Sequence, residues 1–213
     1  MMSKLRLEWA THESARYACE NWHYSKKIPN SKLVKIGVWE DKDFKGVVIY
    51  GVGACPMLVK QYGLKPEQGC ELVRIALRDH DHFVSEIISK SIKMLKESNP
   101  KLDLIVSYAD MDQDHQGKIY QATNWIYTGS IGENKKSAYL IDGKKVHRKT
   151  VGDRLNSRNL VCNINNIKKI YETDYVEDFI SKGKHKYLMP LNKKMRKKIN
   201  LLRVEYPSAD IVK

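Results

Sequence analysis

The stretch LDLIVSYADMDQDHQGKIYQATNWIYTGS (Leu102–Ser130) decides the fold that the sequence predicts. Its first residues are apolar, partly β-branched and bounded by Pro100 and Asp110, which favours a buried strand over a helix. A polar, acidic loop follows, then a short helix over 117–124 and a second strand from Trp125. A strand–loop–helix–strand unit opens a crevice at the carboxyl end of its first strand, where α/β folds bind ligands.

Four polar side chains fall at that place: Ser107, Tyr108, Asp110 and Tyr120. A carboxylate near a phenol can take a proton while the phenol stabilises developing negative charge, which predicts a catalytic site. The alternative is a well-packed unit with a solvated acidic loop, in which Asp110 caps the next helix and Tyr120 belongs to the core. The stretch alone leaves both interpretations open.

Length and composition indicate one domain, or one domain with an elaborated tail, because the chain has 213 residues and is 42% apolar. Its apolar runs are too short for a transmembrane helix, and its N-terminus lacks the apolar core of a signal peptide. We therefore expect a cytoplasmic protein with no membrane partner. The four cysteines are scattered without CxxC spacing, which indicates reduced thiols.

The positive charge is concentrated in the C-terminal part. Residues 1–130 hold 18 Lys and Arg against 16 Asp and Glu, whereas residues 131–213 hold 20 against 9. The sequence thus predicts a near-neutral catalytic body over 1–130 and a basic part over 131–213 that contacts a polyanion, with double-stranded DNA as the expected partner. The alternative is a generally basic soluble protein. The candidate nucleic-acid contacts are Lys26, Lys27, Lys135, Lys136, Arg148, Lys149, Arg154, Arg158, Lys184, Lys186, Arg196 and Lys197.

The hydrophobic periodicity predicts an α+β fold, with a mixed, mostly antiparallel sheet and helices on both faces. Cys70–Leu77 and Leu102–Tyr108 are expected to be its two central, neighbouring strands. The other expected strands are Leu5–Trp9, Val34–Glu40, Gly46–Val52, Trp125–Thr128, Ala138–Ile141, Lys145–Val151 and Lys186–Leu191. The expected helices are Thr11–Trp22, Met57–Tyr62, Val84–Glu97, Gly117–Asn124, Asn165–Tyr171, Asp174–Ile180 and Lys193–Leu202.

Two further places carry polar groups of interest. The first helix ends in WHYSKK, where His23 can titrate near neutral pH beside the Tyr24 phenol; an ordinary amphipathic helix end explains it equally well. The strand CELVRIAL carries Glu71 and Arg74, which strict alternation places on opposite sides. They indicate either a strand that faces a site or a buried ion pair.

A metal site is not expected from the alternating aspartates. An EF-hand that began at Asp110 would need Gly at its sixth position and Glu at its twelfth, and His115 and Gln121 stand there. His80, His82 and His115 are interpreted as loop histidines, so a metal requirement stays open.

The order of the predicted elements resembles the GNAT-type acyltransferase fold. More specifically, the sequence is similar to the phage Mom family of DNA-modifying proteins, over nearly the whole chain. Several separated motifs in the right order are more specific than any one of them. The matching segments are WHYSK (Trp22–Lys26), ELVRI (Glu71–Ile75), VSYAD (Val106–Asp110), GKIYQATNWIYTG (Gly117–Gly129) and KHKYLMPLNKKMRKKI (Lys184–Ile199).

The resemblance implies a phage enzyme that converts adenine in DNA to carbamoylmethyl-adenine and so protects the DNA from restriction enzymes. Carried over residue by residue, it places His23, Tyr24, Asp110 and Tyr120 at the active site. Ser107 is a further catalytic candidate, and Arg74 is a candidate for cofactor binding. Either His23 or Asp110 could then be the base, and either tyrosine could donate to the developing oxyanion.

One departure from the GNAT pattern concerns the group donor. GNAT enzymes hold the pyrophosphate of acyl-coenzyme A on a Q/R-x-x-G-x-G/A loop, and the corresponding segment 78–83 (RDHDHF) has two carboxylates and no glycine. An acyl-coenzyme A donor is therefore disfavoured, and an activated glycine such as glycyl-tRNA is favoured. Iron held by His23 and Asp110 is the alternative route. A basic, GNAT-like module that binds DNA without catalysis, or an acyltransferase with another substrate, is the alternative function.

Overall fold

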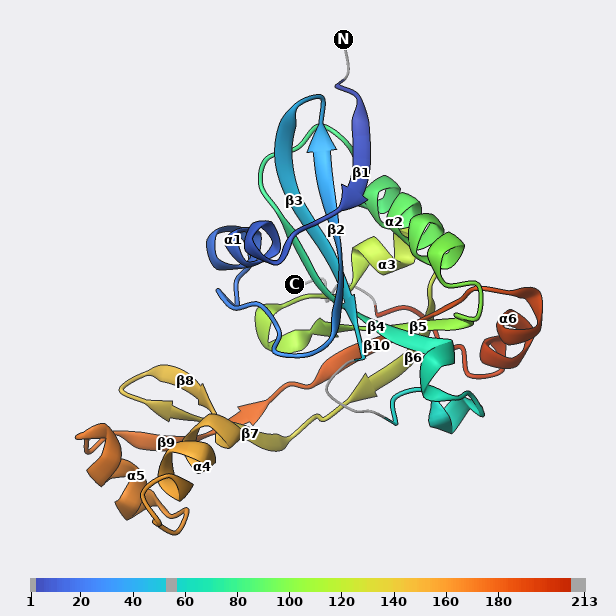
Figure 1. Ribbon diagram of the computed structural model, residues 1–213. Helices are drawn as coiled ribbons and strands as arrows, with labels where there is room; N and C mark the ends of the chain where they lie inside the picture. The colour runs from blue at the N-terminus through green and yellow to red at the C-terminus, as the bar shows by residue number, and fades with distance from the viewer. Residues whose placement is uncertain (1–2, 53–56, 208–213) are drawn as a thin grey trace, which may run out of the picture. The chain divides into compact units, whose positions relative to one another are not determined.

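The computed structural model describes residues 3–52 and 57–207, and the chain divides into two compact units (Figure 1). Unit 1 comprises Met1–Ala109, Gln116–Gly129 and His185–Lys213, and unit 2 comprises Asp110–His115 and Ser130–Lys184. Residues 131–213, the basic part of the sequence, contribute to both units.

Unit 1 is built on a seven-stranded sheet in the order β1-β2-β3-β4-β5-β10-β6. The strands are β1 (Leu5–Trp9), β2 (Leu33–Glu40), β3 (Asp43–Gly51), β4 (Gly69–Leu77), β5 (Leu104–Asp110), β6 (Ile126–Ile131) and β10 (Lys184–Pro190). The helices are α1 (His12–Trp22), α2 (Val84–Ser98), α3 (Lys118–Ala122), α6 (Lys193–Asn200) and the 3-10 turns η1 (Lys60–Tyr62) and η2 (Pro66–Gln68). This order of strands and helices confirms the predicted α+β class and the element order on which the GNAT resemblance rests.

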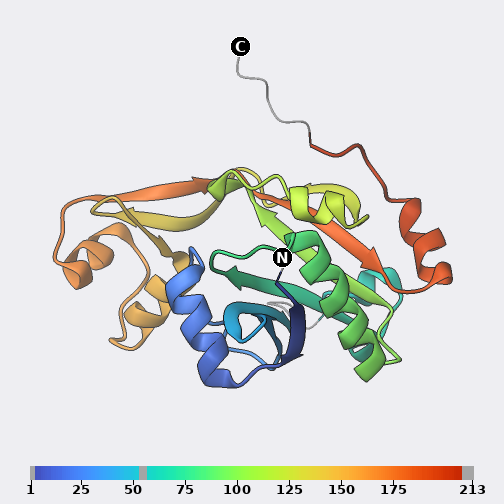
Figure 2. The same ribbon diagram turned by 90° about the horizontal axis from the view of Figure 1, so that it is seen from above.

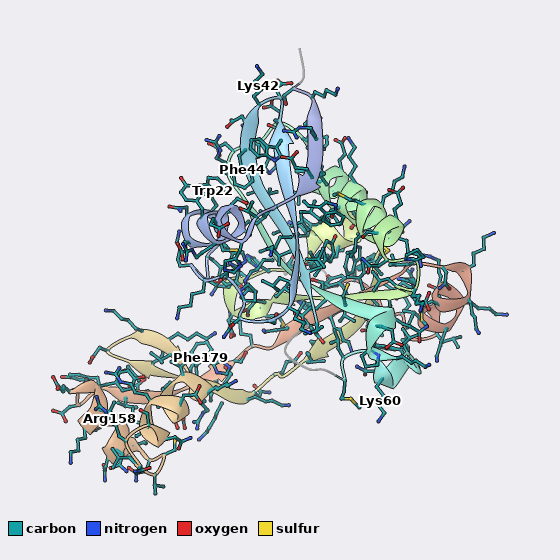
Figure 3. All side chains as sticks on the ribbon, in the orientation of Figure 1. Trp22, Lys42, Phe44, Lys60, Arg158 and Phe179 are labelled. Atoms are coloured by element: carbon teal, nitrogen blue, oxygen red, sulfur yellow. The ribbon has the colours of Figure 1, made fainter. Side chains whose placement is uncertain are left out.

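Helices cover both faces of the sheet, as the strand β3 shows. Val47 and Ile49 point to the face on which Ala15, Ala18 and Cys19 of α1 pack. The side chains between them, Val48 and Tyr50, pack with α2 on the opposite face. Figure 2 shows the two helices on either side of the N-terminal strands. On the α1 face, Trp22 lies beside Phe44, with ring centroids 5.8 Å apart (Figure 3).

The start of α1 follows the predicted local chemistry. The Thr11 hydroxyl accepts the backbone N–H of Ser14 at 3.1 Å, and so satisfies one of the amides that a helix leaves unpaired at its N-terminus. A backbone hydrogen bond and the Thr11 side chain lower the pKa of Glu13 in the first turn. Small residues on the inner side of α1 let the helix lie close to β3.

The two predicted central strands are neighbours, which confirms that prediction. β4 and β5 pair in parallel over only three residues, from Gly69 opposite Leu104 to Glu71 opposite Val106. Both strands continue, to Leu77 and Asp110, without further pairing to each other. We call the region where the two strands are no longer paired, 72–77 of β4 and 107–110 of β5, the split. The backbone edges that face one another there are available to side chains, because no ladder occupies them.

β5 is antiparallel to β10 along its other edge. The N–H of Leu191 donates to Asp103 O, and near the other end the N–H of Met111 donates to Gly183 O. In an antiparallel pair, the numbers of any two opposite residues have the same sum, and both of these bonds give that same sum. The register therefore places Lys186 opposite Tyr108 and Tyr187 opposite Ser107.

A β-bulge in β4 corrects the prediction for Glu71 and Arg74. Ile49 of β3 faces Arg74, but the next residue, Tyr50, faces Leu72, so Val73 is the extra residue of the bulge. Since a bulge reverses the alternation beyond it, Glu71 and Arg74 lie on the same face of the sheet, that of α1. Strict alternation could not have predicted this arrangement.

Unit 2 contains a three-stranded antiparallel sheet in the order β8-β7-β9, with two helices. Its hairpin turns at Asp142 and Gly143, whose φ angles of 49° and 73° fit the predicted two-residue turn. A small core joins the sheet to both helices, through residues such as Tyr139, Leu155 and Ile167. The elements are η3 (Met111–Gln113), β7 (Lys135–Ile141), β8 (Lys144–His147), α4 (Arg148–Asn156), α5 (Ile164–Tyr171) and β9 (Val176–Ser181).

Two predicted elements of unit 2 are wrong. The expected helix Asp174–Ile180 is the strand β9, because its backbone pairs with β7, a partner that local sequence does not reveal. The expected strand Lys145–Val151 ends at His147, where α4 begins. The His147 Nδ1 accepts the N–H of Lys149 at 3.1 Å, and histidine is not among the usual N-cap residues.

Candidate functional site

A buried polar network lies at the split, on the α2 and α3 face. The Ser107 hydroxyl is 2.9 Å from Leu72 O, on the unpaired part of β4, and 2.8 Å from the Tyr120 hydroxyl. Ser107 is fully buried and Tyr120 nearly so. One serine hydroxyl carries one proton, so it can donate to the carbonyl or to the phenol but not to both at once. When it donates to Tyr120, the phenolic proton is left for another acceptor.

Tyr120 is both a core residue and a polar one. Its ring contacts Trp125 and Tyr187, with centroids 5.0 Å away in each case. Burial raises the pKa of Tyr120 to about 12, although the Ser107 hydrogen bond acts to lower it. The phenol therefore stays protonated at neutral pH, which makes it a hydrogen-bond donor and not a base.

His23 and Tyr24 follow the last turn of α1. The buried His23 ring stacks against Tyr24, with centroids 4.3 Å apart, and half of Tyr24 is exposed. The backbone N–H of Ser25 donates to His23 Nδ1 at 3.1 Å. Because this nitrogen accepts a hydrogen bond, the neutral ring carries its proton on Nε2.

The split brings groups from the two faces within electrostatic reach of each other. After burial, the pKa of Tyr120 is raised further by Tyr24, from the end of α1, and by Glu71, from the α1 face of β4. Tyr120 itself packs on the other face. The structure thus places four of the predicted positions, His23, Tyr24, Ser107 and Tyr120, around one part of unit 1.

Arg74, the candidate for cofactor binding, lies on the α1 face. Its Nη1 donates to Val73 O at 2.8 Å, while its buried Nε has no hydrogen-bond partner among the described residues. The guanidinium also acts on Cys19 of α1: burial raises the pKa of this thiol and Arg74 opposes the rise. An unsatisfied buried donor is costly, which is consistent with a position that receives a ligand.

Asp110 belongs to unit 2, where it begins the 3-10 turn η3. Its carboxylate accepts the backbone N–H of Asp112 at 3.0 Å, which is the cap that the structural interpretation predicted. Asp112 has a larger structural role, since it accepts hydrogen bonds from the Ser181 hydroxyl, the Lys182 N–H and the Lys145 ammonium. Burial would raise the pKa of Asp112, but these donors lower it overall.

The segment 78–83, which corresponds to the pyrophosphate loop of GNAT enzymes, already holds an anion of this chain. The buried Glu40 carboxylate accepts the N–H of Asp81 at 2.8 Å and the N–H of His82 at 3.0 Å, and Lys45 lies 3.5 Å from it. The sequence shows the acidic loop, but no local pattern connects it to Glu40, which lies at the end of β2. Only the fold brings Glu40 to these amides.

No group of three or more His, Cys, Asp or Glu side chains in the described ranges is arranged to hold a metal ion. Cys19, Cys70 and Cys162 are free thiols, and Cys55 lies outside the described residues. Burial raises the pKa of Cys70 to about 12, so this thiol is unreactive at neutral pH. Over the part of the chain that is described, no helix has the length and apolar character needed to cross a bilayer.

The positive charge is distributed between the two units differently from the way it is distributed along the sequence. Unit 1 holds 26 Lys and Arg against 15 Asp and Glu, a net charge of +11, whereas unit 2 holds 12 against 10, a net of +2. The difference comes mainly from residues 185–213, which return to unit 1. In α6, five of eight residues are Lys or Arg and none is acidic; only Met195 and Ile199 of this helix are buried.

Several predicted DNA contacts are engaged within unit 2. Lys136 and Arg148 both bind Asp178, and Arg148 also donates to the Tyr139 hydroxyl at 2.8 Å. Of the predicted contacts, the exposed cations with no ion pair among the described residues are Lys27, Lys135, Lys149, Arg154, Arg158, Lys184 and Lys197. Lys26, by contrast, donates to Asn21 O.

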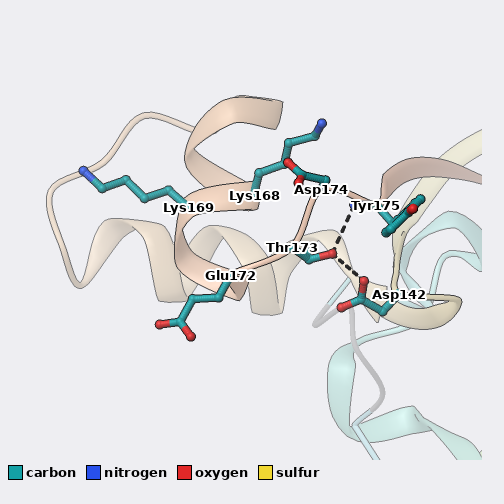
Figure 4. A pocket seen from close by; sticks show the side chains of 7 residues that line it. All are labelled: Asp142, Lys168, Lys169, Glu172, Thr173, Asp174 and Tyr175. Atoms are coloured by element: carbon teal, nitrogen blue, oxygen red, sulfur yellow. Dashed lines mark hydrogen bonds between the residues drawn. The ribbon is translucent and has the colours of Figure 1, made fainter.

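Unit 2 also has an open hollow of about 540 Å³ at the C-terminal end of α5 (Figure 4). The Thr173 hydroxyl bonds the Asp142 carboxylate and accepts the N–H of Tyr175 at the rim. The lining has three acidic residues and two lysines, a mixture that does not favour a phosphate backbone. The lining residues are Asp142, Lys168, Lys169, Glu172, Thr173, Asp174 and Tyr175.

Residues 4–208 match the model of the Mom protein family. The chain belongs to the Mom protein family. A relative from Escherichia phage Mu, described as methylcarbamoylase mom, is 27% identical over 203 residues, which cover 92% of this chain and 80% of the relative. The family resemblance seen in the motifs is therefore confirmed.

Two solved acetyltransferases were also found. A Bacillus subtilis acetyltransferase in complex with CoA is 14% identical and covers 89% of this chain and 100% of its own, with a TM-score of 0.49. A spermidine/spermine N-acetyltransferase, SpeG, from Vibrio cholerae in complex with manganese ions is 10% identical and covers 91% and 96%, also with a TM-score of 0.49.

Proposed function

We propose that this protein modifies adenine in double-stranded DNA, and converts its exocyclic amine to a carbamoylmethyl derivative. Family membership and the name of the phage Mu relative support this function. The observation that carries it is the network at the split, where Ser107 and Tyr120 on one face lie within electrostatic reach of Tyr24 on the other. A modified adenine would protect the DNA that carries it from restriction enzymes.

The substrate must leave the duplex before it reacts. The exocyclic amine of adenine is a poor nucleophile because its lone pair is delocalised into the ring, and a stacked base does not reach an enzyme's buried groups. The half-exposed Tyr24, stacked on His23, offers a flat aromatic surface for an extruded base. The cations of α6 offer phosphate contacts.

The candidate residues divide into donors and a base. Tyr120 stays protonated, so it can donate a hydrogen bond to the oxyanion that forms when the amine attacks a carbonyl. His23 also acts as a donor in its neutral form, through Nε2. Asp110 is then the proposed base that takes the proton from the amine. Ser107 orients the Tyr120 hydroxyl, because a hydrogen bond donated by Ser107 leaves the phenolic proton for the oxyanion.

A glycyl ester, such as glycyl-tRNA, is the proposed donor. Attack of the adenine amine on the ester carbonyl forms the amide bond and releases the tRNA hydroxyl, which receives the proton that the base removed. The new free amine of the glycyl group can then attack the ring carbon and displace the amide nitrogen. The product is a carbamoylmethyl-adenine, an isomer of the first product, so no further reagent is needed.

The occupied loop 78–83 supports this donor over acyl-coenzyme A. A pyrophosphate would need the amides of Asp81 and His82, which the Glu40 carboxylate already occupies. The pyrophosphate would also lie against the Glu40 carboxylate, and two anions in contact repel strongly in a buried site.

The test is nucleoside analysis of DNA from bacteria that express the chain. We expect a new adenine nucleoside with the mass of an added carbamoylmethyl group, and its loss in Tyr120→Phe. Tyr139→Phe is the matched control, because Tyr139 is also a buried phenol in a hydrogen bond, which it accepts from Arg148 at 2.8 Å, but belongs to unit 2. Unmodified DNA from cells with the folded parent protein would refute the function and leave a DNA-binding module.

A further inference from the structure

Lys186 has an unusual environment for a residue that the sequence assigns to a DNA-contacting surface. It lies in the middle of β10 and is only partly exposed. Its ammonium lies 5.1 Å from the centre of the Tyr62 ring, and burial alone lowers the pKa of Lys186. Among the described residues it has no ion pair and no side-chain hydrogen bond. A desolvated ammonium without an acceptor is costly to keep in a folded protein.

Two other partly buried lysines of unit 1, Lys45 and Lys96, have acceptors, whereas the partly buried Lys35 has none among the described residues. Lys45 pairs with Asp43 at 3.1 Å and with Glu40, and Lys96 donates to two backbone carbonyls, those of Pro100 and Leu102. Lys186 differs from Lys45 and Lys96 because its ammonium is desolvated beside Tyr62 and has no acceptor among the described residues. A ligand that supplies the missing negative charge explains this difference.

The position of Lys186 connects it to the split. The β5–β10 register places Lys186 opposite Tyr108, and both side chains point to the face that carries α1 and α6. Tyr108 follows Ser107, whose side chain points to the other face, toward Tyr120. Tyr108 therefore follows the catalytic candidate Ser107 on the opposite face of β5, and Lys186 lies next to Tyr108 on β10, across the paired edge of β5.

We propose that Lys186 binds one phosphodiester group of the DNA strand that carries the target adenine, beside the split. This inference rests on the proposed function. A base extruded toward Tyr24 and Tyr120 brings its own backbone phosphate to the protein, and this phosphate needs a cation at a defined place. The tyrosines beside Lys186 can donate hydrogen bonds to phosphate oxygens but cannot neutralise the lysine, because Tyr62 keeps its proton through burial. The site is thus positive and selective for an anion.

A partly desolvated pair of ammonium and phosphate is stronger than a contact on the exposed surface. Replacement of Lys186 should therefore weaken DNA binding by about 10- to 100-fold, which is the range for a charged hydrogen bond. The exposed cations of the chain should each contribute far less. Because the free protein gains stability when an unpaired buried charge is removed, Lys186→Met should melt at the same temperature as the parent or higher.

The test measures the affinity for duplex DNA by fluorescence anisotropy, together with thermal melting, for Lys186→Met, Lys186→Arg and Lys101→Met. Lys101 is an exposed lysine with no described partner, and its loss should leave the affinity unchanged. As the pH rises through the lowered pKa of Lys186, the parent should lose affinity before Lys186→Arg does, since Arg stays charged. Tyr62 from η1 lies against the Lys186 ammonium and Tyr108 of β5 lies opposite Lys186, while Lys198 of α6 donates to Tyr62 O at 2.7 Å.

The outcomes separate this inference from the proposed function, because they need no modified adenine. Parental DNA affinity in Lys186→Met overturns the inference. So does a loss of affinity that comes with a clearly lower melting temperature and is not restored by Lys186→Arg. Unchanged DNA affinity with weaker binding of tRNA would assign the site to the donor instead, and would also overturn it as stated.

Discussion

The two units of this protein use charged residues in different ways. In unit 2, Lys136, Arg148 and Lys145 bind aspartates of the same unit, Asp178 and Asp112, so part of its positive charge is neutralised internally. In unit 1, the helix α6 displays five cations without an acidic residue. A charge count along the sequence assigns the basic character to 131–213, whereas the structure assigns most of it to unit 1. Charge that is paired within a fold is not available to a polyanion.

The units also differ in how they hold the catalytic candidates. Tyr120 in unit 1 is fixed by aromatic packing and by the Ser107 hydroxyl. Asp110 in unit 2 is fixed by a single backbone hydrogen bond from Asp112. Unit 1 therefore presents a rigid, protonated donor, and unit 2 presents a carboxylate at the start of a turn. The following experiments test this contrast.

The largest effect is expected from Tyr120→Phe, which removes the proposed oxyanion donor and keeps the ring. The formation of modified adenine should fall about 100- to 1,000-fold, while DNA affinity stays unchanged, because the donor acts in the transition state. The measurement is nucleoside analysis beside a binding titration. Asp110→Asn should be equally inactive and as stable as the parent, since an amide oxygen can still cap η3. Full activity in either variant removes that residue from the mechanism.

A second large effect is expected from Asp112→Ala in unit 2. This change removes the acceptor for the Ser181 hydroxyl, the Lys182 N–H and the Lys145 ammonium, and should lower the free energy of unfolding by about 1–3 kcal/mol. Tryptophan fluorescence is a suitable comparison, because all four tryptophans belong to unit 1. In Asp112→Ala, circular dichroism should therefore report the unfolding of unit 2 at a lower denaturant concentration than tryptophan fluorescence reports the unfolding of unit 1. Coincident curves would mean that the two units unfold together.

The paired and unpaired cations can be compared by the salt dependence of DNA binding. Replacement of Arg196 and Lys197 in α6 by Gln should reduce the slope of log K against log salt by about 1.8, or 0.9 for each phosphate contact. The matched change of Lys136 and Arg148 should alter the slope less and should destabilise unit 2, because their partner is Asp178. Equal slopes in the two double variants would mean that pairing within unit 2 does not limit DNA contact.

The smallest effects are expected from pH, with opposite signs in the two units. The lowered pKa of Asp112 contributes stability above the unfolded value of about 4, and this stability is lost as the pH falls through the folded value. The raised pKa values of Tyr120 and Tyr187, about 12 in both, contribute stability below the unfolded value of about 10. This stability is lost as the pH rises toward 12.

Acid should therefore weaken unit 2 through Asp112, and alkali should weaken unit 1 through Tyr120 and Tyr187. Denaturant unfolding at a series of pH values gives the free energy of unfolding as a function of pH. In Asp112→Asn this curve should become flatter on its acid side and stay unchanged on its alkaline side. An acid side that stays the same in this variant would assign acid unfolding to other carboxylates.

The sequence by itself determined those features that depend on near neighbours in the chain. Apolar periodicity predicted α1, α2 and the strands β1 to β5, the Thr11 hydroxyl marked the start of α1, and Asp142-Gly143 marked a hairpin turn. Motif order led to the Mom family and to the residues around the split. These features are local because helix caps, turns and alternation involve residues only a few positions apart.

Only the tertiary structure decided features that depend on distant partners. The bulge at Val73, which moves Arg74 to the face of Glu71, is set by pairing with β3, and β9 is a strand because β7 pairs with it. The amides of 81 and 82 are filled by Glu40, about forty residues earlier in the sequence. The desolvation of Lys186 depends on Tyr62. Burial and long-range hydrogen bonds set these properties, and neither is encoded in the residues on either side.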